Sequence, residues 1–300
     1  MKVSVAIPTY GRDEVLLETV RTLLALETRA DELLVLDQTP QHVEAVERAL
    51  AELDRHGDIR WLRLPRPSIP ATMNRAFLEA EGDIVLFLDD DVIPSEHLVQ
   101  GHRSAYQDPN VWAVVGQVLQ PGEAEIDPPP TSSESCRDLE FAFNQNRGAF
   151  VENVMAGNLS VRRDRAIQVG GFDENYVTVA HRFESDFAIR VVDAGGRIWF
   201  EPSASIRHLK APSGGTRTWG HPLTSASPAH SVGDYYFALT SVPRGKRFRY
   251  AAHRMFRSVR TRFHLRHPWW IPVKLVGEVR GLAQALLLRR RGRALLRMPR

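Results

Sequence analysis

Short apolar runs alternate with stretches of helical periodicity along the first ninety residues. Helical spacing of apolar residues begins after Asp13 and again after Thr39, which is followed by Pro40, so both polar residues are expected to cap a helix N-terminus. The apolar runs between them are too short for helices and predict strands. We expect strands at residues 2–9, 32–37, 59–64 and 83–89, and helices at residues 15–24, 39–53 and 70–80.

This alternation predicts an α/β fold, in which a mostly parallel sheet is sandwiched by helices. In such sheets ligands bind at the carboxyl ends of the strands. Polar residues stand at three of these predicted ends: Thr9 and Tyr10, then Asp37, then the triplet Asp89–Asp91. We therefore expect them to gather at one edge of the sheet.

The second half of the chain is less regular. We expect a short helix from Glu184, closed by Gly195 in the left-handed conformation and followed by a strand at residues 197–200. Residues 123–135 are rich in Pro and Ser and predict an exposed loop. Residues 211–233 show no periodicity, and a loop of this length is typical of a functional lid or of disorder. Arg217 and Trp219 make it a candidate lid over a ligand.

Composition is that of a globular protein, because 43% of the 300 residues are hydrophobic and 25% are charged. The net charge of +3 conceals an asymmetry. Residues 244–300 carry 17 Lys and Arg against one acid, so of the totals of 39 basic and 36 acidic residues, 22 and 35 fall in residues 1–243. We expect an acidic enzyme body, residues 1–243, followed by a basic amphipathic helical tail, residues 244–300.

Three features bear on the compartment. Cys136 is the single cysteine, so no intrachain disulfide can form and a reducing environment fits best. The N-terminus lacks the long apolar core of a signal peptide. No window approaches the ~18 apolar residues of a membrane span. We expect a cytoplasmic protein, or one bound peripherally to the inner face of a membrane.

The run VLFLDDDVIP places three carboxylates directly after a buried strand. Residues two apart in a strand share a face, so Asp89 and Asp91 are expected to point the same way and Asp90 the opposite way. Paired carboxylates suit Mg²⁺ or Mn²⁺, which would neutralise a diphosphate. The alternative is a solvated acidic turn in which Asp90 or Asp91 caps the next helix.

Several motifs together resemble the family 2 glycosyltransferases, an inverting group with the GT-A fold. They are VSVAIPTYGR, LLVLDQT, IPATMNRAFLEAEGDIVLFLDDDVIP, AGNLSVRRDRAIQVGGFDENY and FESDFAIRV, spread over residues 2 to 210. The resemblance implies a GT-A, Rossmann-like domain over residues 1–243. Its nucleotide-binding half would cover about residues 1–118 and its acceptor half about residues 119–243.

The resemblance also assigns donor-binding roles. Residues expected around the base and ribose are Pro8, Thr9, Tyr10 and Arg12, with Asp37 accepting the ring N–H of the base and Asn74 near the donor. Asp89 would contact the ribose, Asp91 would ligate the metal, and Asp90 could share either task. Relatives often have Gly-Ser or Asn-Ser after the Asp37 position, where this chain has Gln38 and Thr39, which changes the local turn.

The acceptor side is expected to carry the catalytic base. The family usually has Glu-Asp, one residue, then Asp, so Glu184 stands where an Asp is expected and Asp186 fits the later position. Glu184 is our first choice for the base because a helix N-terminus favours its ionised form. Asp186 is the second choice, although it also suits an i,i+4 pair with Arg190.

Further residues follow from the resemblance. Gly157 and Asn158 match the segment beneath the donor sugar and acceptor, and Gly170 and Gly171 are expected to be structural. His208 stands where many GT-A enzymes place a late metal ligand. These assignments would make Asp89, Asp91 and His208 the metal site, for Mn²⁺ or Mg²⁺.

The tail and the overall activity leave alternatives open. The tail combines arginines with aromatic residues, which is typical of a segment that binds an anionic membrane; nucleic-acid binding is the less favoured rival, and docking on the acidic body is the third alternative. The expected activity is inverting sugar transfer from a nucleotide-diphosphate sugar, with UDP first, to a glycan or lipid-linked acceptor. A nucleotidyltransferase, a Mg²⁺-binding receiver domain and a non-catalytic glycan binder remain alternatives.

Overall fold

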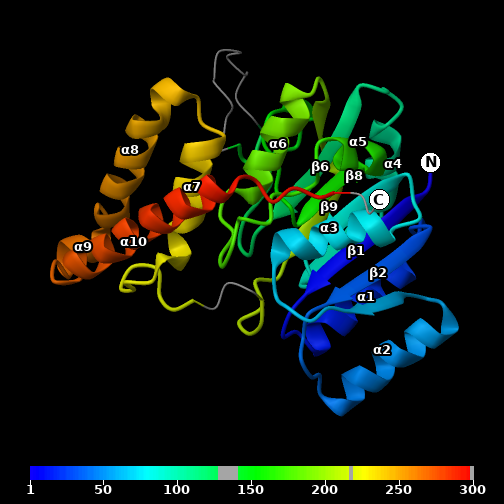
Figure 1. The fold of residues 1–300 in the computed structure, drawn as a ribbon. Helices are drawn as coiled ribbons and strands as arrows, with labels where there is room; N and C mark the ends of the chain where they lie inside the picture. Colours follow the sequence, from blue (N-terminus) through cyan, green and yellow to red (C-terminus); the bar gives the residue numbers. More distant parts are fainter. Residues whose placement is uncertain (128–140, 216–218, 298–300) are drawn as a thin grey trace.

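The computed structural model describes residues 1–127, 141–215 and 219–297 (Figure 1). Over these ranges a nine-stranded sheet has the order β3-β2-β1-β4-β8-β6-β9-β5, and β7 pairs with β9. The strands are β1 (Val3–Thr9), β2 (Glu32–Asp37), β3 (Arg60–Arg63), β4 (Ile84–Leu88), β5 (Val92–Pro94), β6 (Val111–Leu119), β7 (Ala149–Val151), β8 (Asn158–Arg162) and β9 (Arg197–His208). The helices of the body are α1 (Glu14–Ala25), α2 (Glu44–His56), α3 (Ile69–Glu79), α4 (Leu98–Ala105), α5 (Arg163–Gln168), α6 (Phe183–Asp193), the 3₁₀ helix η1 (Pro228–His230) and α7 (Val232–Thr240).

The predicted strands form the parallel half of the sheet. β3, β2, β1 and β4 run parallel, and the register sets Thr9 level with Asp37 at their carboxyl ends. The prediction of an α/β fold is confirmed. The sheet is mixed, however, because β8 runs antiparallel to both β4 and β6. β9 extends the predicted strand at residues 197–200 as far as His208.

The start of α2 differs from the prediction. The helix begins at Glu44, with Val43 as its N-cap, and not at Thr39. The N–H of Thr39 donates to Asp37 Oδ1 (2.8 Å), and the N–H of Val43 donates to Asp13 Oδ1 (3.2 Å). These side-chain acceptors hold the chain in a turn ahead of the helix. The prediction that Thr39 caps the N-terminus of this helix was therefore wrong.

An aromatic cluster packs α6 against the sheet. Phe172 contacts Phe77 on α3 and Phe87 on β4, with ring centroids 5.7 and 5.9 Å away. It also contacts Phe183 (5.4 Å) and Phe187 (4.4 Å) on α6, and all five rings are buried. Because these rings fix the first turns of α6, they fix the position of Glu184 relative to the strands.

The tail forms a helical layer beside the body (Figure 1). After the 3₁₀ helix η2 (Arg244–Lys246) come α8 (Arg247–Val259), α9 (Arg262–Arg266) and α10 (Trp270–Arg291), and α10 packs against α7, η1 and α8. Trp270 is the first residue of α10, and Pro272 lies inside this helix. In the part of the chain that is described, no helix combines the length and apolar character that a membrane crossing requires.

A short C-terminal segment returns to the body. This strap, residues 292–297, accepts a hydrogen bond from the N–H of Glu174 at Ala294 O (2.9 Å) and donates one from Leu296 to Gly170 O (2.7 Å). Gly170 and Gly171 have φ of 83° and 58°, and a Cβ on Gly171 would overlap Asn74 Oδ1. Only glycine suits this turn, as predicted. Docking of the tail on the body is therefore present in the fold.

Candidate functional site

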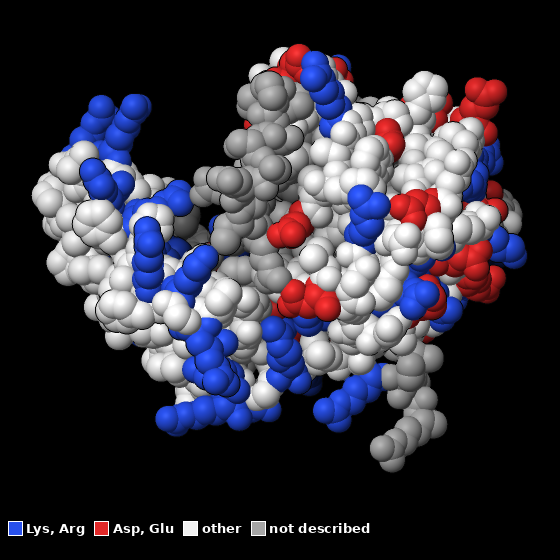
Figure 2. All heavy atoms as spheres, turned by 90° about the horizontal axis from the view of Figure 1, so that it is seen from above, with Lys and Arg blue, Asp and Glu red and all other residues white. Residues whose placement is uncertain are grey.

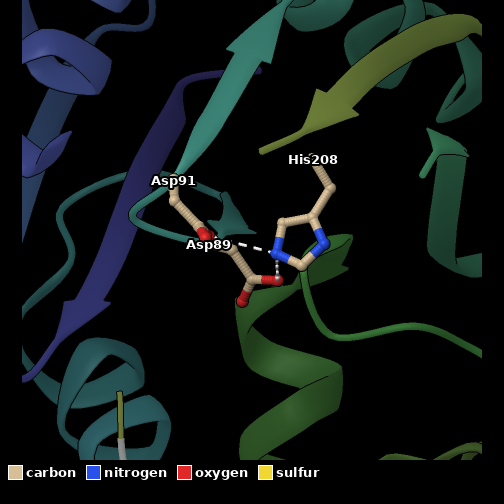
Figure 3. A group of neighbouring side chains, drawn as sticks. All are labelled: Asp89, Asp91 and His208. Atoms are coloured by element: carbon tan, nitrogen blue, oxygen red, sulfur yellow. Dashed lines mark hydrogen bonds and ion pairs between the residues drawn. The ribbon is translucent and has the colours of Figure 1, made fainter. Parts of the chain in front are cut away.

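Two aspartates and a histidine converge where β4 and β9 end. Figure 3 shows Asp89, Asp91 and His208 directed at one another. His208 Nε2 lies 3.1 Å from Asp91 Oδ1 and 3.7 Å from Asp89 Oδ2, and one ligand atom from each residue lies within 4.8 Å of the others. The Asp89 side chain is 53% exposed, so an incoming ligand can reach it. The expected convergence of these three residues is present.

This donor set fits a divalent metal. Carboxylate oxygens are the ligands that Mg²⁺ and Mn²⁺ prefer, and an imidazole nitrogen is acceptable to Mn²⁺. Burial alone would raise the pKa of Asp91, but hydrogen bonds from His208 and from the N–H of Ala211 outweigh it and hold the pKa below its usual value. The hydrogen bond to Asp91 in turn raises the pKa of His208. Asp91 is therefore ionised at neutral pH, as a metal ligand must be.

Asp90 points away from this group, as the alternation predicted. Its carboxylate accepts a hydrogen bond from Thr9 Oγ1 (2.7 Å) and faces Arg12 Nε (3.3 Å). Burial, aided by the neighbouring Asp89 and Asp91, raises the pKa of Asp90 to about 7. Asp90 and Thr9 are both buried, so they anchor the triplet rather than line an open ligand site.

Arg12 lies against the triplet. Its guanidinium contacts Asp90, Asp91 Oδ2 (3.4 Å) and the carbonyls of Ala211 (3.0 Å) and Ser213. It thus brings positive charge to the carboxylates and ties the end of β9 to β1. Its contact with the base and ribose of the donor stays a prediction.

The segment after Tyr10 meets the start of the predicted lid. The N–H of Gly215 donates to Tyr10 O (2.7 Å), and Tyr10 and Pro8 are half-buried. Residues 211–215 therefore cover the edge of β1. Arg217 lies outside the described residues, as do Cys136 and residues 128–135 of the predicted loop, while Trp219 is exposed.

Asp37 is fully buried, and its carboxylate already has three hydrogen-bond donors. Oδ2 contacts His42 Nε2 (2.8 Å) and Trp61 Nε1 (2.9 Å), and Oδ1 accepts from the N–H of Thr39. His42 also bonds Asp13 through Nδ1 (2.7 Å). In this structure Asp37 shapes the turn before α2, and its carboxylate has no open face for a base N–H.

Asn74 and Asn158 bond to the fold itself. Asn74 is buried and bonds the N–H and O of Phe172 (2.7 and 2.8 Å), which fixes the turn after α5. Asn158 donates to Gln117 O and Ala204 O and contacts His102 Nε2 (2.8 Å). Burial lowers the pKa of His102 to about 4, so this ring is neutral. Both asparagine side chains therefore have structural partners, and their substrate contacts stay predictions.

Gly157 lies against the metal group. Its carbonyl accepts the N–H of Asp89 (3.3 Å), and a Cβ at this position would overlap Asp89 Oδ2. Glycine is required here because the backbone approaches a carboxylate at van der Waals contact. Gly157 therefore belongs to the site, on the side predicted for the donor sugar and acceptor.

The two candidate bases on α6 have different environments. Glu184 lies in the first turn of α6 and is half-buried. Asp186 is fully buried, with Arg190 Nε at 3.0 Å, Arg293 Nη1 at 2.7 Å and the Ser241 hydroxyl also on its carboxylate. An Asp held by two arginines inside the fold is a structural anchor, so this geometry argues against Asp186 as a base.

Several supporting residues escaped the sequence analysis. Gln120 Oε1 contacts His208 Nδ1 (3.0 Å), which orients the ring so that Nε2 faces the carboxylates. Thr19 on α1 donates to Asp90 O (3.0 Å) and holds the backbone of the triplet. Thr19 lies within α1, and Gln120 follows β6, which is not among the predicted strands, so only the tertiary fold reveals them.

Comparison with known proteins places the chain in a family. Residues 4–169 match Glycosyl transferase family 2. The chain belongs to this glycosyltransferase family. A pre-mycofactocin glycosyltransferase of Mycobacterium tuberculosis is 28% identical over 51% of the chain, which spans 33% of that protein's length. A glucosyl-dolichyl phosphate glucuronosyltransferase of Haloferax volcanii is 25% identical over 69% of each chain.

Solved structures agree on the fold. The crystal structure of GalNAc-T7 with UDP, GalNAc and Mn²⁺ superimposes with a TM-score of 0.63 at 14% identity, covering 82% of this chain and 50% of that one. The chain therefore has the GT-A fold that the motifs predicted.

Proposed function

We propose that this protein is an inverting, metal-dependent glycosyltransferase that uses a nucleoside diphosphate sugar, with UDP as the first nucleotide to test. The observation that carries the proposal is the convergence of Asp89, Asp91 and His208 at the carboxyl end of the sheet in a family 2 chain. The acceptor would be a hydroxyl of a glycan or of a lipid-linked glycan. Residues 1–118 would hold the donor and residues 119–243 the acceptor.

The residues have distinct tasks in this mechanism. Asp91 and His208 would hold Mn²⁺ or Mg²⁺, with Asp89 completing the set or contacting the ribose. When bound, the metal neutralises charge on the diphosphate leaving group. Arg12 keeps Asp90 and Asp91 close to one another despite their charges. Gly157 lets the backbone approach the Asp89 carboxylate closely.

Glu184 would remove the proton from the acceptor hydroxyl as the sugar passes through an oxocarbenium-like state. Its place at the N-terminus of α6 favours the ionised carboxylate. The buried bond from Ser185 Oγ to Asn153 (2.9 Å) ties this turn to the segment that ends at Gly157.

Thermal unfolding with UDP, GDP, dTDP and CMP, each with and without Mn²⁺, tests the donor site. A nucleotide that binds only the native form raises the melting temperature. We expect a rise that needs both metal and nucleotide in the wild type, together with slow cleavage of the matching nucleotide sugar. Full turnover in Asp91→Ala would overturn the proposal.

A non-catalytic glycan binder of the same fold is the second candidate, because Glu184 replaces the expected Asp. Glu184→Gln keeps the shape of the side chain and removes the base. If sugar transfer falls at least about a hundredfold while donor binding persists, the chain is an enzyme with this base. Equal transfer by the variant and the wild type would exclude that role for Glu184. The family match favours sugar transfer over nucleotidyl transfer.

The tail is proposed to bind an anionic membrane surface. Figure 2 shows Lys and Arg side chains gathered over the tail helices at the left of this face, while the Asp and Glu side chains lie on the body. Exposed apolar side chains accompany them, with Phe248 at 85%, Leu265 at 79% and Trp269 at 63% exposure. Basic side chains with interfacial aromatics are the pattern of a peripheral membrane segment.

Vesicle sedimentation tests this part of the proposal. We expect the protein to bind vesicles with 30% anionic phospholipid and to leave purely zwitterionic ones unbound. Leu265→Glu should weaken binding, while Val43→Glu, at an exposed apolar position on the body, should not. Equal loss in both variants would show that the tail is not the contact surface.

A further inference from the structure

A second cavity lies between the tail and the body, and none of Asp89, Asp91 and His208 lines it. Its volume is about 740 Å³, which is within the range of small-molecule sites. Its walls come from the turn before α6, the segment around η1, and helices α8 and α10. A cavity of this size, built from both parts of the chain, has no role in the donor site described above.

The lining is strongly cationic. Four of its residues are Arg or Lys (Arg182, Arg254, Arg257 and Lys274), three are His, and the one acid is Asp234. Cations gathered around one cavity repel one another unless acids or a bound anion compensate them. Charge alone therefore favours an anionic ligand.

Acids hold three of these cations in place. Asp234 contacts Arg254 Nε (3.0 Å) and Arg182 Nε (3.6 Å). Glu278, fully buried behind the lining, contacts Lys274 Nζ (2.8 Å) and Arg254 Nη1 (3.4 Å). These contacts fix the positions of Arg182, Arg254 and Lys274 around the cavity.

The turn that carries Arg182 into the cavity is held in an unusual conformation. Thr178, Ala180 and Arg182 all have left-handed φ values of 62°, 54° and 71°. Thr178 Oγ1 donates to Ala229 O (3.0 Å), and a Cβ on Gly233 would overlap His181 O, so α7 packs directly on the turn. Backbone strain that packing maintains in this way is common at ligand sites.

Arg182 also connects the cavity to the proposed base. It is the N-cap of α6, two residues before Glu184, so the two Cα atoms lie within about 7 Å along the chain. Arg182 therefore links the cavity wall directly to the first turn of α6. The apolar side chains of Val179 and Leu223 give the cavity a nonpolar wall beside its cations.

We propose that this cavity binds the phosphate or diphosphate group of the acceptor substrate. The inference rests on the proposed glycosyltransferase function and names the acceptor as a phosphate-bearing compound. An arginine guanidinium can donate two hydrogen bonds to phosphate oxygens at once, and the lining offers three arginines together with Lys274. The donor's diphosphate is assigned to the metal site, so the acceptor is the substrate left for this cavity.

Calorimetric titration of the full-length protein in EDTA tests the site, because EDTA removes the metal that would bind a diphosphate at Asp91. The probes are inorganic pyrophosphate and farnesyl diphosphate. Arg257→Gln and Arg182→Gln should each weaken binding about tenfold. Arg249→Gln, on the same helix α8 but outside the cavity, is the matched control and should change binding less than about twofold.

The outcomes separate the sources of the phosphate. Tighter binding of farnesyl diphosphate than of pyrophosphate supports a lipid-borne acceptor, and equal binding supports a soluble phosphate compound. Binding of neither probe by the wild type would overturn the inference, as would equal losses in Arg257→Gln and Arg249→Gln. Arg257 lies on an exposed helix face, so the comparison of Arg257→Gln with Arg249→Gln stays valid even if Arg182→Gln disturbs folding. Failure of the glycosyltransferase proposal would appear separately, as absence of nucleotide-sugar cleavage with Mn²⁺.

Discussion

Arg293 joins the C-terminal strap to the buried acids of the body, and its removal should destabilise the fold measurably. Its Nη1 lies 2.7 and 2.8 Å from the two oxygens of Asp186 and 3.4 Å from Asp173 Oδ2. Both aspartate side chains are completely inaccessible, whereas that of Arg293 is 26% exposed. Arg293→Ala would therefore leave two buried carboxylates with fewer compensating charges.

The size of the destabilisation depends on the partners that Asp186 and Asp173 keep. Removing one partner of a buried ion pair costs about 3–5 kcal/mol when the other charge is left uncompensated. Asp186 keeps Arg190, and Asp173 keeps the hydroxyl of Tyr236 (2.9 Å), so we take the lower limit of about 3 kcal/mol. With an unfolding entropy of about 2 cal/mol/K per residue over 300 residues, this corresponds to a fall in melting temperature of about 5 °C.

Thermal unfolding followed by circular dichroism at pH 7 provides the measurement. Arg297→Ala, at an exposed position in the same strap, is the control and should shift the midpoint by less than about 1 °C. Arg293→Lys should recover part of the loss, because a lysine restores the charge without the guanidinium fork. A midpoint for Arg293→Ala that equals the control's would refute the reasoning and show that the strap is not docked in solution.

Three further predictions concern the site and the tail interface. Asp91→Asn should lose the Mn²⁺-dependent thermal shift given by UDP, and a retained shift would show that the metal binds elsewhere. Gly157→Ala should reduce donor turnover at least about tenfold, because the added Cβ would overlap Asp89. Gly245→Ala is the control and should leave turnover unchanged, because a Cβ there has no neighbour within 4 Å. Equal effects of the two substitutions would contradict the packing argument. Burial alone would raise the pKa of Asp234, but its cationic partners outweigh it and lower the pKa. A lowered pKa in the folded state gives stability that is present above about pH 4 and is lost as the pH falls further. Asp234→Asn should therefore flatten the acid side of a plot of melting temperature against pH. Parallel plots for the variant and the wild type would contradict this.

The sequence predicted the parts of the site that depend on local geometry. Asp89 and Asp91 follow a fully buried strand, and their two-residue spacing puts both carboxylates on one side of the chain. The register of β1 with β2 makes Thr9 and Asp37 level, as the rule for parallel strands requires. His208 came from the family resemblance alone, because nothing in its neighbours distinguishes a ligand from any other histidine.

Three polar residues that the resemblance assigned to substrates bond to the fold itself, and all three are buried. Asp37, Asn74 and Asn158 are accessible to at most 1%, and the partners of both asparagines include backbone groups far away in the sequence. Asn74, for example, bonds Phe172, 98 residues along the chain. A polar side chain near a strand end can serve a ligand or the fold, and only the tertiary partners decide between them. Strand β6 shows the same limit, because its apolar run is evident but its place between β8 and β9 is not.

The tail also shows why a charge asymmetry in the sequence has more than one structural meaning. Arg254, Lys274 and Arg293 are partly or fully buried, and each compensates an acid: Asp234, Glu278 or Asp186. Arg254 and Arg293 bond acids of the body, Asp234 and Asp186, and so hold the tail to it, whereas Lys274 pairs with Glu278 within α10. Membrane binding must therefore depend on the exposed basic residues of the tail. Salt should accordingly weaken membrane binding by the tail well before it loosens the tail from the body, since exposed charges are screened more than buried ones.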